Sequence, residues 1–352
     1  MDRDKSADAG KVGPELMAGE NRLDQLVATW DEVIRKAFLD AVYLMRSGAD
    51  IAQLVRMLEN RDVDGALRAV GLDPVQFRPF DKAIADAYEA GGNFGAKAIP
   101  PKIDPVGHRL IVMFDVRNPE AEAWLRDYSS GLVTEILTDQ RTAIKETLTA
   151  AMALGNNPKV AALDLVGRIG PSGKREGGVI GLTSGQAEWV RRYEAELASN
   201  APGDALSRNL RDRRFDSAVK KAQAAGKPIP AEQRAKMVAA YRNRALKYRG
   251  EVIGRTEAMT ALHQAQHEAM RQAIDKGVVQ QSAVTKIWHS AADSRVRETH
   301  RHLNGQKVAF GKAFKSDLGP IRFPGDPEAS AANTIQCRCT LFMHVDFLAG
   351  VT

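Results

Sequence analysis

Long apolar runs, cysteines and aromatic residues are all scarce in this chain of 352 residues. No apolar run approaches the roughly 20 residues that a membrane-spanning helix needs. The polar N-terminus, MDRDKSADAG, also lacks the apolar core of a signal peptide. We therefore expect a soluble protein, made in a cytoplasm and without a membrane segment. The two cysteines, Cys337 and Cys339, are one residue apart, which excludes the disulfide framework of small secreted proteins.

Residues that favour helix are abundant, because Ala, Leu, Arg, Glu, Gln and Lys dominate much of the sequence. Apolar residues recur at helical spacing from Leu23 to Phe38, and Asn118-Pro119 is a typical helix start. The sequence thus predicts a mainly α protein. The expected helices cover about residues 21–48, 50–59, 62–70, 74–92, 119–154, 158–169, 184–198 and 231–277. Ile111–Phe114 is expected to be a strand or a buried extended segment.

Composition changes and Gly/Pro clusters divide the chain into five expected parts. The first boundary between folded regions is placed at Gly91-Gly92-Asn93 and Pro100-Pro101. The C-terminal part is expected to be a small α+β unit with strands near 286–288, 306–310 and 340–345 and a helix over 293–303. The parts are a flexible tail (1–20), an N-terminal helical region (21–105), a helical domain (106–200), a basic long-helix segment (201–285) and the C-terminal unit (286–352).

Positive charge is concentrated in one segment. Between Ala205 and Gly250, thirteen Lys or Arg residues stand against three acids, a net charge of +10, whereas the whole chain carries +6. Such a segment is expected to face DNA phosphates or an acidic protein surface, although a solvated charged helix explains it equally well. Tyr241 and Tyr248 are its main aromatic residues, too few for a base-stacking platform. The candidate contact residues are Arg208, Arg211, Arg213, Arg214, Lys220, Lys221, Arg234, Lys236, Arg242, Arg244, Lys247 and Arg249.

Residues 286–344 hold most of the chemically distinctive side chains. Trp288 is followed by the pattern D-x-R-x-R-x2-H, then L-x-G, P-G-D-P and C-R-C. A helix carrying Arg255 and Glu257 precedes this stretch by some thirty residues. The motif residues are Arg255, Glu257, Trp288, Asp293, Arg295, Arg297, His300, Gly305, Pro324, Gly325, Asp326, Cys337 and Cys339.

This ordered set of motifs resembles the C-terminal domain of the phage Mu F-like family of minor head, or head morphogenesis, proteins. The resemblance covers about a third of the chain. It implies a virion component near the portal that assists head assembly or DNA delivery, made in the cytoplasm of a bacterial host. The portal protein is the implied partner, with double-stranded DNA and the major capsid or scaffold protein as further ones. The family often has a segment like PPLHPNC where this chain reads FPGDPEASAANTIQC.

Metal binding is one interpretation of the C-terminal motifs. Cys337 and Cys339 supply thiolates and His300 an imidazole, which are donors suited to zinc, and Asp293, His289 or His302 would complete a tetrahedral set. Against this, the C-x-C spacing is unusual for zinc and no second pair exists. The alternative is that both cysteines are reduced, partly buried thiols.

Catalysis is a second interpretation, in which His300 acts as a general base and the arginines bind an anion. The resulting hypothesis is a metal-assisted nuclease, or another phosphodiester-acting enzyme, that uses Asp293, His300, Cys337 and Cys339. A structural role, with Asp293 paired to an arginine, uses the same residue types, and the family resemblance favours it. We therefore assign no catalytic residue.

Two other features resemble functional motifs without matching them. His263 and His267 are four apart, as in helical zinc sites, but HQAQHE lacks the glutamate of a zinc protease, so a solvated helix face is expected. The glycine-rich stretch 170–178 resembles a phosphate loop, but its spacing is wrong and no Ser or Thr follows Lys174. A connecting loop is expected there.

Overall fold

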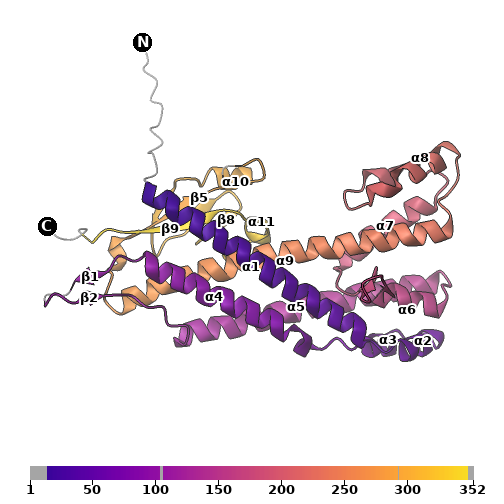
Figure 1. Ribbon diagram of the computed structural model, residues 1–352, viewed down its shortest axis with the longest axis horizontal. Helices are drawn as coiled ribbons and strands as arrows, with labels where there is room; N and C mark the ends of the chain where they lie inside the picture. Colours follow the sequence, from indigo (N-terminus) through magenta and orange to yellow (C-terminus); the bar gives the residue numbers. More distant parts are fainter. Residues whose placement is uncertain (1–13, 104–105, 292, 348–352) are drawn as a thin grey trace, which may run out of the picture. The chain divides into compact units, whose positions relative to one another are not determined.

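The computed structural model describes residues 14–103, 106–291 and 293–347, and its chain divides into two compact units. Unit 1 comprises residues 1–32, 85–122 and 255–352, and unit 2 comprises residues 33–84 and 123–254. Figure 1 shows that helices predominate, as predicted, with small antiparallel sheets in the C-terminal region. The α-helices are α1 (Pro14–Gly48), α2 (Ile51–Glu59), α3 (Val63–Val70), α4 (Arg78–Ala98), α5 (Pro119–Ala153), α6 (Pro158–Val166), α7 (Ser184–Ala198), α8 (Asp216–Ala224), α9 (Ala231–Asp275), α10 (Glu298–Arg301) and α11 (Ala331–Thr334).

The strands are short, and each pairs antiparallel with its neighbour. The largest sheet has the order β6-β5-β9, with Lys286 of β5 opposite Val308 on one side and Met343 on the other. The strands are β1 (Lys102–Ile103), β2 (Arg109–Leu110), β3 (Arg168–Ile169), β4 (Arg175–Glu176), β5 (Val284–His289), β6 (Lys307–Ala309), β7 (Phe314–Ser316), β8 (Gly319–Ile321) and β9 (Thr340–Val345).

Polar caps mark the starts of four helices in unit 2. Asp50, Asp62 and Asn157 each accept a backbone N–H at the start of α2, α3 or α6. Thr183 and Gln186 form a reciprocal capping box at the start of α7. These caps explain why the predicted boundaries of these four helices agree closely with the structure at their N-terminal ends.

Buried arginine fixes the glycine-rich stretch of unit 2. Arg46 of α1 is 0% exposed, and its guanidinium donates to the carbonyls of Gly178 (2.8 Å) and Ile180 (2.7 and 2.9 Å). Burial lowers the pKa of Arg46 to about 10. The stretch 170–178 contains the β3–β4 turn and β4, so it forms a connection with its carbonyls turned toward arginine.

The sheet of unit 1 packs around two apolar clusters. Trp288 of β5 is fully buried and lies edge-on to Phe314, with ring centroids 5.3 Å apart. The second cluster joins Met270 and Ala273 of α9 to Val284 of β5. The C-terminal α+β unit therefore has its own core and also shares one with the end of α9.

Several predicted boundaries were wrong. The helix expected from residue 21 begins at Pro14, while residues 1–13 of the expected tail lie outside the described residues. The helix expected to end at residue 92 continues to Ala98, so Gly91-Gly92-Asn93 lies within α4. Glycine there allows close packing, since a Cβ on Gly91 would lie 2.6 Å from Leu262 Cα. Residues 111–114 form no strand, although Val112 packs against a core cluster.

The helix expected over 293–303 is reduced to the single turn of α10. Asp293 accepts the backbone N–H of Arg295 at 2.9 Å, which makes a local turn that competes with helix. The long helix predicted over residues 231–277 is confirmed, because α9 continues through Gly250 and Gly254 for 45 residues.

Candidate functional site

Most of the predicted DNA-contact residues are paired with acids inside unit 2. Arg211 binds Asp216 at 2.9 Å, and Arg214 and Arg244 share the buried Asp212 at 2.7 and 3.2 Å. Arg208 pairs with Glu196, Lys236 pairs with Glu232 at 2.8 Å, and Arg234 donates to the carbonyl of Ile229 at 3.1 Å. Much of the positive charge is therefore matched locally.

Arg242 and Arg249 are buried, being 6% and 7% exposed. Arg242 donates to Gly177 O at 3.2 Å, and Arg249 donates to Gly181 O at 2.9 Å. Burial lowers the pKa of Arg249 to about 10. Like Arg46, these two residues donate hydrogen bonds to backbone carbonyls within residues 177–181. Their role is therefore structural. Sequence spacing alone did not separate them from the exposed arginines.

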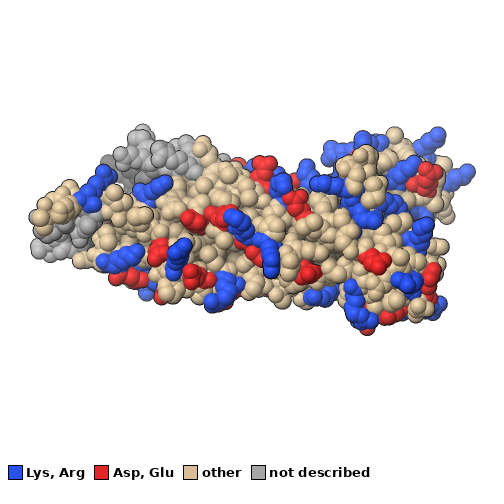
Figure 2. Space-filling view, turned by 60° about the horizontal axis from the view of Figure 1, so that its bottom comes forward, with Lys and Arg blue, Asp and Glu red and all other residues tan. Residues whose placement is uncertain are grey.

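Four of the predicted contact residues remain exposed, and their side chains make no hydrogen bond or ion pair with any described residue. They are Arg213, Lys220, Lys221 and Lys247. The side chain of Lys227, in the turn after α8, is likewise exposed and makes no ion pair or hydrogen bond with a described residue. Figure 2 shows lysine and arginine gathered over the part of unit 2 that holds α8. This exposed set is the surface of unit 2 best suited to an anionic partner.

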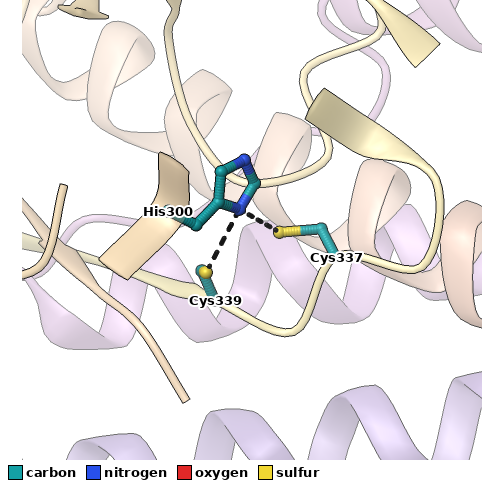
Figure 3. Close-up of side chains that lie close together, drawn as sticks. All are labelled: His300, Cys337 and Cys339. Atoms are coloured by element: carbon teal, nitrogen blue, oxygen red, sulfur yellow. Dashed lines mark hydrogen bonds between the residues drawn. The ribbon is translucent and has the colours of Figure 1, made fainter. Parts of the chain in front are cut away.

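Three predicted metal ligands come together in unit 1 (Figure 3). His300 Nδ1 lies 3.6 Å from Cys337 Sγ and 3.5 Å from Cys339 Sγ. Each of the three residues is 1% exposed, and all their donor atoms lie within 4.8 Å of one another. The group comes from α10 and from the segment that leads into β9. Residues some 40 positions apart thus converge on one buried point.

The two thiols of this group ionise differently. The neighbouring Cys339 sulfur, followed by burial, raises the pKa of Cys337 well above its usual value. The Cys337 thiol lowers the pKa of Cys339, and the ring of His300 adds to that shift. Cys339 is therefore the thiol that ionises first.

A small pocket of about 120 Å³ lies beside the group and reaches His300 and Cys339. Three arginines line it, namely Arg295, Arg297 and Arg338, together with Val296 and Gln336. The pocket therefore places three arginine side chains beside the thiol of Cys339 and the imidazole of His300.

Asp293 lies outside the His/Cys group. Its carboxylate pairs with Arg338 and, at 3.5 Å, with Arg295. The other residues considered as a fourth ligand also have separate contacts. His289 lies edge-on to Phe342, and His302 is 3.5 Å from Asp317. Arg297 donates to the carbonyls of Asn333 (3.4 Å) and Ile335, just before Cys337.

The P-G-D-P motif forms a turn that docks on α9. Asp326 accepts the backbone N–H of Arg322 at 2.8 Å and its side chain at 2.6 Å. Gly325 has φ +78°, and its carbonyl accepts Thr260 Oγ1 at 2.9 Å. A Cβ on Gly325 would lie 2.9 Å from the Thr260 nitrogen, which explains why glycine suits this position. Pro324 precedes this turn in the sequence.

The remaining motif residues also have structural contacts. Arg255 binds Asp31 at 3.2 Å, and Glu257 is buried. Gly305 has φ +76° and donates its N–H to Trp288 O at 2.8 Å, which joins the α10 turn to β5. The motif therefore specifies turns and ion pairs around the core, with the His/Cys group at its centre.

His263 is buried and His267 is partly buried, contrary to the expected solvated face. His263 is 0% exposed, and His267 stacks on Phe310 with ring centroids 4.4 Å apart. Burial lowers their pKa values to about 4 and about 3. Both rings are therefore neutral parts of the packing of unit 1.

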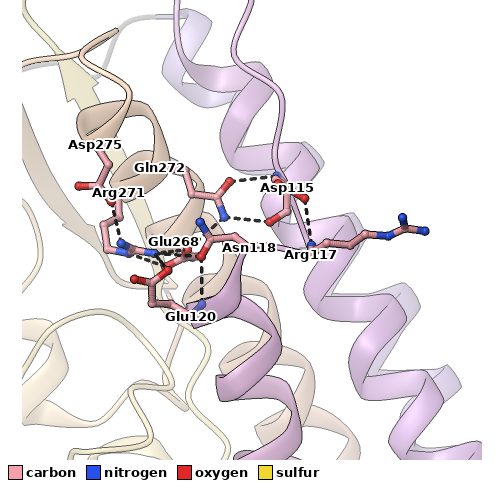
Figure 4. A network of polar contacts seen from close by, with 8 residues as sticks. All are labelled: Asp115, Arg117, Asn118, Glu120, Glu268, Arg271, Gln272 and Asp275. Carbon is pink, nitrogen blue, oxygen red and sulfur yellow. Dashed lines mark hydrogen bonds and ion pairs between the residues drawn. The ribbon is translucent and has the colours of Figure 1, made fainter.

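A second polar cluster joins the start of α5 to the end of α9 within unit 1 (Figure 4). Arg271 binds Glu268 at 2.6 Å, Asp275 at 2.7 Å and Glu120 at 3.3 Å. Gln272 exchanges two 2.9 Å hydrogen bonds with the backbone of Asp115. These contacts are consistent with a structural role. No motif or spacing in the sequence predicted the cluster.

Asn333 contacts the His/Cys group but was not among the residues predicted from the sequence. Its Oδ1 lies 3.2 Å from His300 Nε2, on the opposite side of the ring from the thiols. In the sequence it is one polar residue in a loop-like stretch, SAANTIQC, with no periodicity to mark it.

Comparison with known proteins identifies one family that part of this chain resembles. Residues 204–342 match the family model described as Phage Mu protein F like protein. Searches of curated proteins and of solved structures found no match. Among the described residues, no helix is both long and apolar enough to cross a membrane. The matched residues include α8, α9, the β6-β5-β9 sheet up to Phe342 and the His/Cys group. Residues 204–342 therefore match the domain that defines the phage Mu protein F like family.

Proposed function

We propose that this protein is a minor head protein of a bacteriophage that binds the portal and assists head assembly or DNA delivery. The observation that carries the proposal is the match of residues 204–342 to the Mu F-like family. The portal is the proposed direct partner, with the major capsid or scaffold protein as further candidates, and the virion head is the proposed location.

A contact with packaged double-stranded DNA is the second part of this proposal. The exposed cations around α8, Arg213, Lys220 and Lys221, support it because unpaired Lys and Arg can neutralise phosphates without reading sequence. The acid-paired arginines nearby contribute less, since their charge is already matched. The proposed contact is therefore salt-sensitive and independent of DNA sequence.

Co-expression with the portal protein of the same genome tests the proposal. We expect a discrete complex of fixed stoichiometry, detected by size-exclusion chromatography and mass measurement at moderate salt. A portal from an unrelated phage is the control and is expected to remain separate. Separate elution of the folded protein and its own portal would contradict the portal assignment, as would absence of the protein from purified virions.

A further inference from the structure

The His/Cys group of unit 1 has the spacing of a tetrahedral zinc site. Bonds of about 2.3 Å to sulfur and 2.05 Å to nitrogen at tetrahedral angles place N and S about 3.6 Å apart. His300 Nδ1 lies 3.6 Å from Cys337 Sγ and 3.5 Å from Cys339 Sγ. Both sulfurs are thus at the distance from the nitrogen that a shared ion requires.

The imidazole ring is held so that Nδ1 is available to bind. Asn333 Nδ2 donates to Leu318 O at 3.2 Å, which fixes the amide with its oxygen toward His300. Because Asn333 Oδ1 only accepts, it requires the proton on Nε2, 3.2 Å away. With Nε2 engaged by Asn333, Nδ1 is the ring nitrogen that faces the two sulfurs and can bind a metal held between them. Metal-binding histidines are oriented by this kind of outer hydrogen bond.

The backbone also directs both thiols to one point. Cys337 and Cys339 lie on either side of Arg338, and this spacing of two places side chains on the same side of an extended chain. Arg338 itself pairs with Asp293, away from the group. Thr340 then begins β9, which pairs with β5 along its length and fixes the position of the segment.

We propose that this protein binds one Zn²⁺ through Cys337 Sγ, Cys339 Sγ and His300 Nδ1, with a fourth position open toward the arginine-lined pocket. Two thiolates and an imidazole favour zinc over magnesium or calcium, which prefer oxygen ligands. A water or an anion entering the pocket supplies the fourth ligand. Arg297 favours an anion there, whereas the charges of Arg295 and Arg338 are partly matched by Asp293. Because all three ligands belong to this chain, zinc binding does not require that the protein also binds the portal.

Metal analysis of the full chain, purified without chelators, is the first test. We expect one zinc per chain by elemental analysis. Replacement by Co²⁺ is expected to give the visible bands of tetrahedral cobalt and a thiolate-to-cobalt charge-transfer band. The chain has two cysteines in all, so the intensity of that band reports Cys337 and Cys339 without any mutation. A folded protein that takes up neither zinc nor cobalt would show that the group is a hydrogen-bonded pair of thiols and overturn the proposal.

Matched variants form the second test. Cys339→Ser is expected to lose the bound zinc, whereas His302→Asn is expected to keep it, because His302 is exposed and lies outside the group. Asn333→Ala is expected to weaken zinc affinity about 10- to 100-fold, the usual effect of removing an outer hydrogen bond. If Cys339→Ser does not fold, the cobalt spectrum of the unmodified chain still decides. Equal zinc content in the folded Cys339→Ser and His302→Asn proteins would overturn the assignment.

Discussion

His263 shows how one buried side chain makes stability depend on pH. Its Nδ1 donates to Met259 O at 3.0 Å, and its Nε2 accepts the N–H of Leu341 at 3.3 Å. This arrangement requires a neutral ring, because a proton on Nε2 would face the N–H of Leu341. Burial lowers the pKa of His263 to about 4.

We predict that acid destabilises the fold through His263. The folded pKa lies below the unfolded value of about 6.5, so the unfolded chain binds more protons between these values. Stability is therefore fully present above about pH 6.5 and is lost as the pH falls toward 4, by up to about 1.4 kcal/mol per pH unit. Urea unfolding followed by circular dichroism at pH 7 and pH 5 measures this loss.

His263→Asn is expected to be less stable at pH 7, because its two hydrogen bonds are lost, but less sensitive to the change from pH 7 to pH 5. His344→Asn is the control, since His344 is exposed on β9. An unchanged pH dependence in folded His263→Asn would contradict the prediction.

At the scale of single residues, the sequence identified the members of the His/Cys group better than it predicted which side chains are buried or in contact. His300, Cys337 and Cys339 stood out because of their rare side chains, and the structure brings those three together. Asn333 did not stand out, because its role depends on a contact across 33 positions. His263 was assigned to solvent because a period of four does not indicate which face of a helix is covered.

At the scale of elements, glycines allow α4 and α9 to approach closely within unit 1. Gly91 and Gly95 are one turn apart on α4. A Cβ on Gly91 would lie 2.6 Å from Leu262 Cα, and one on Gly95 would lie 2.9 Å from Gln266 Cα. Both distances are too short for a side chain, so the two helix backbones are in direct contact here.

We predict opposite signs for two Gly→Ala substitutions in helices. Gly91→Ala is expected to destabilise the protein by about 1–3 kcal/mol, because the helices must separate. Gly131→Ala in α5 meets no atom within 4 Å and is expected to stabilise by about 0.5–1 kcal/mol, since alanine favours helix. Chemical denaturation of both variants gives the comparison. Stabilisation by Gly91→Ala would show that the close approach is absent.

The same glycines explain which elements the sequence predicted well. The start of α7 was predicted correctly because its cap is local, within Thr183–Gln186. The end of α4 was wrong because Gly91-Gly92 resembles a break until its partner helix is known. Local signals thus identify the existence and start of helices, whereas contacts between distant segments decide where glycine is structural.

At the scale of the whole molecule, net charge is a poor guide to which cations meet a partner. The segment from Ala205 to Gly250 carries +10, but Arg242 and Arg249 are buried and several others share acids. The cations with no such partner are confined to a few positions on or near α8 and on α9. Charge counting in the sequence located the segment, and only the fold separates structural arginines from exposed ones.

We predict that exposed cations near α8 set the salt dependence of DNA binding. In the triple variant Arg213→Gln, Lys220→Gln, Lys221→Gln, binding is expected to weaken. The slope of log K against log salt is expected to fall by up to about 2.7, since each phosphate contact contributes about 0.9. Fluorescence anisotropy with a duplex of arbitrary sequence, across several salt concentrations, measures both.

The matched control removes the same three charges from elsewhere in unit 2, at Lys36, Arg126 and Arg192, which are exposed and paired with acids. If the exposed set near α8 is the contact, the control keeps the slope of the unmodified protein, because its cations are already matched. An equal loss in both variants would instead assign the effect to net charge. If the unmodified protein does not bind DNA, the same cations would instead contact an acidic surface of a protein partner. The salt dependence of portal binding, measured for both variants, would then show whether the cations near α8 make that contact.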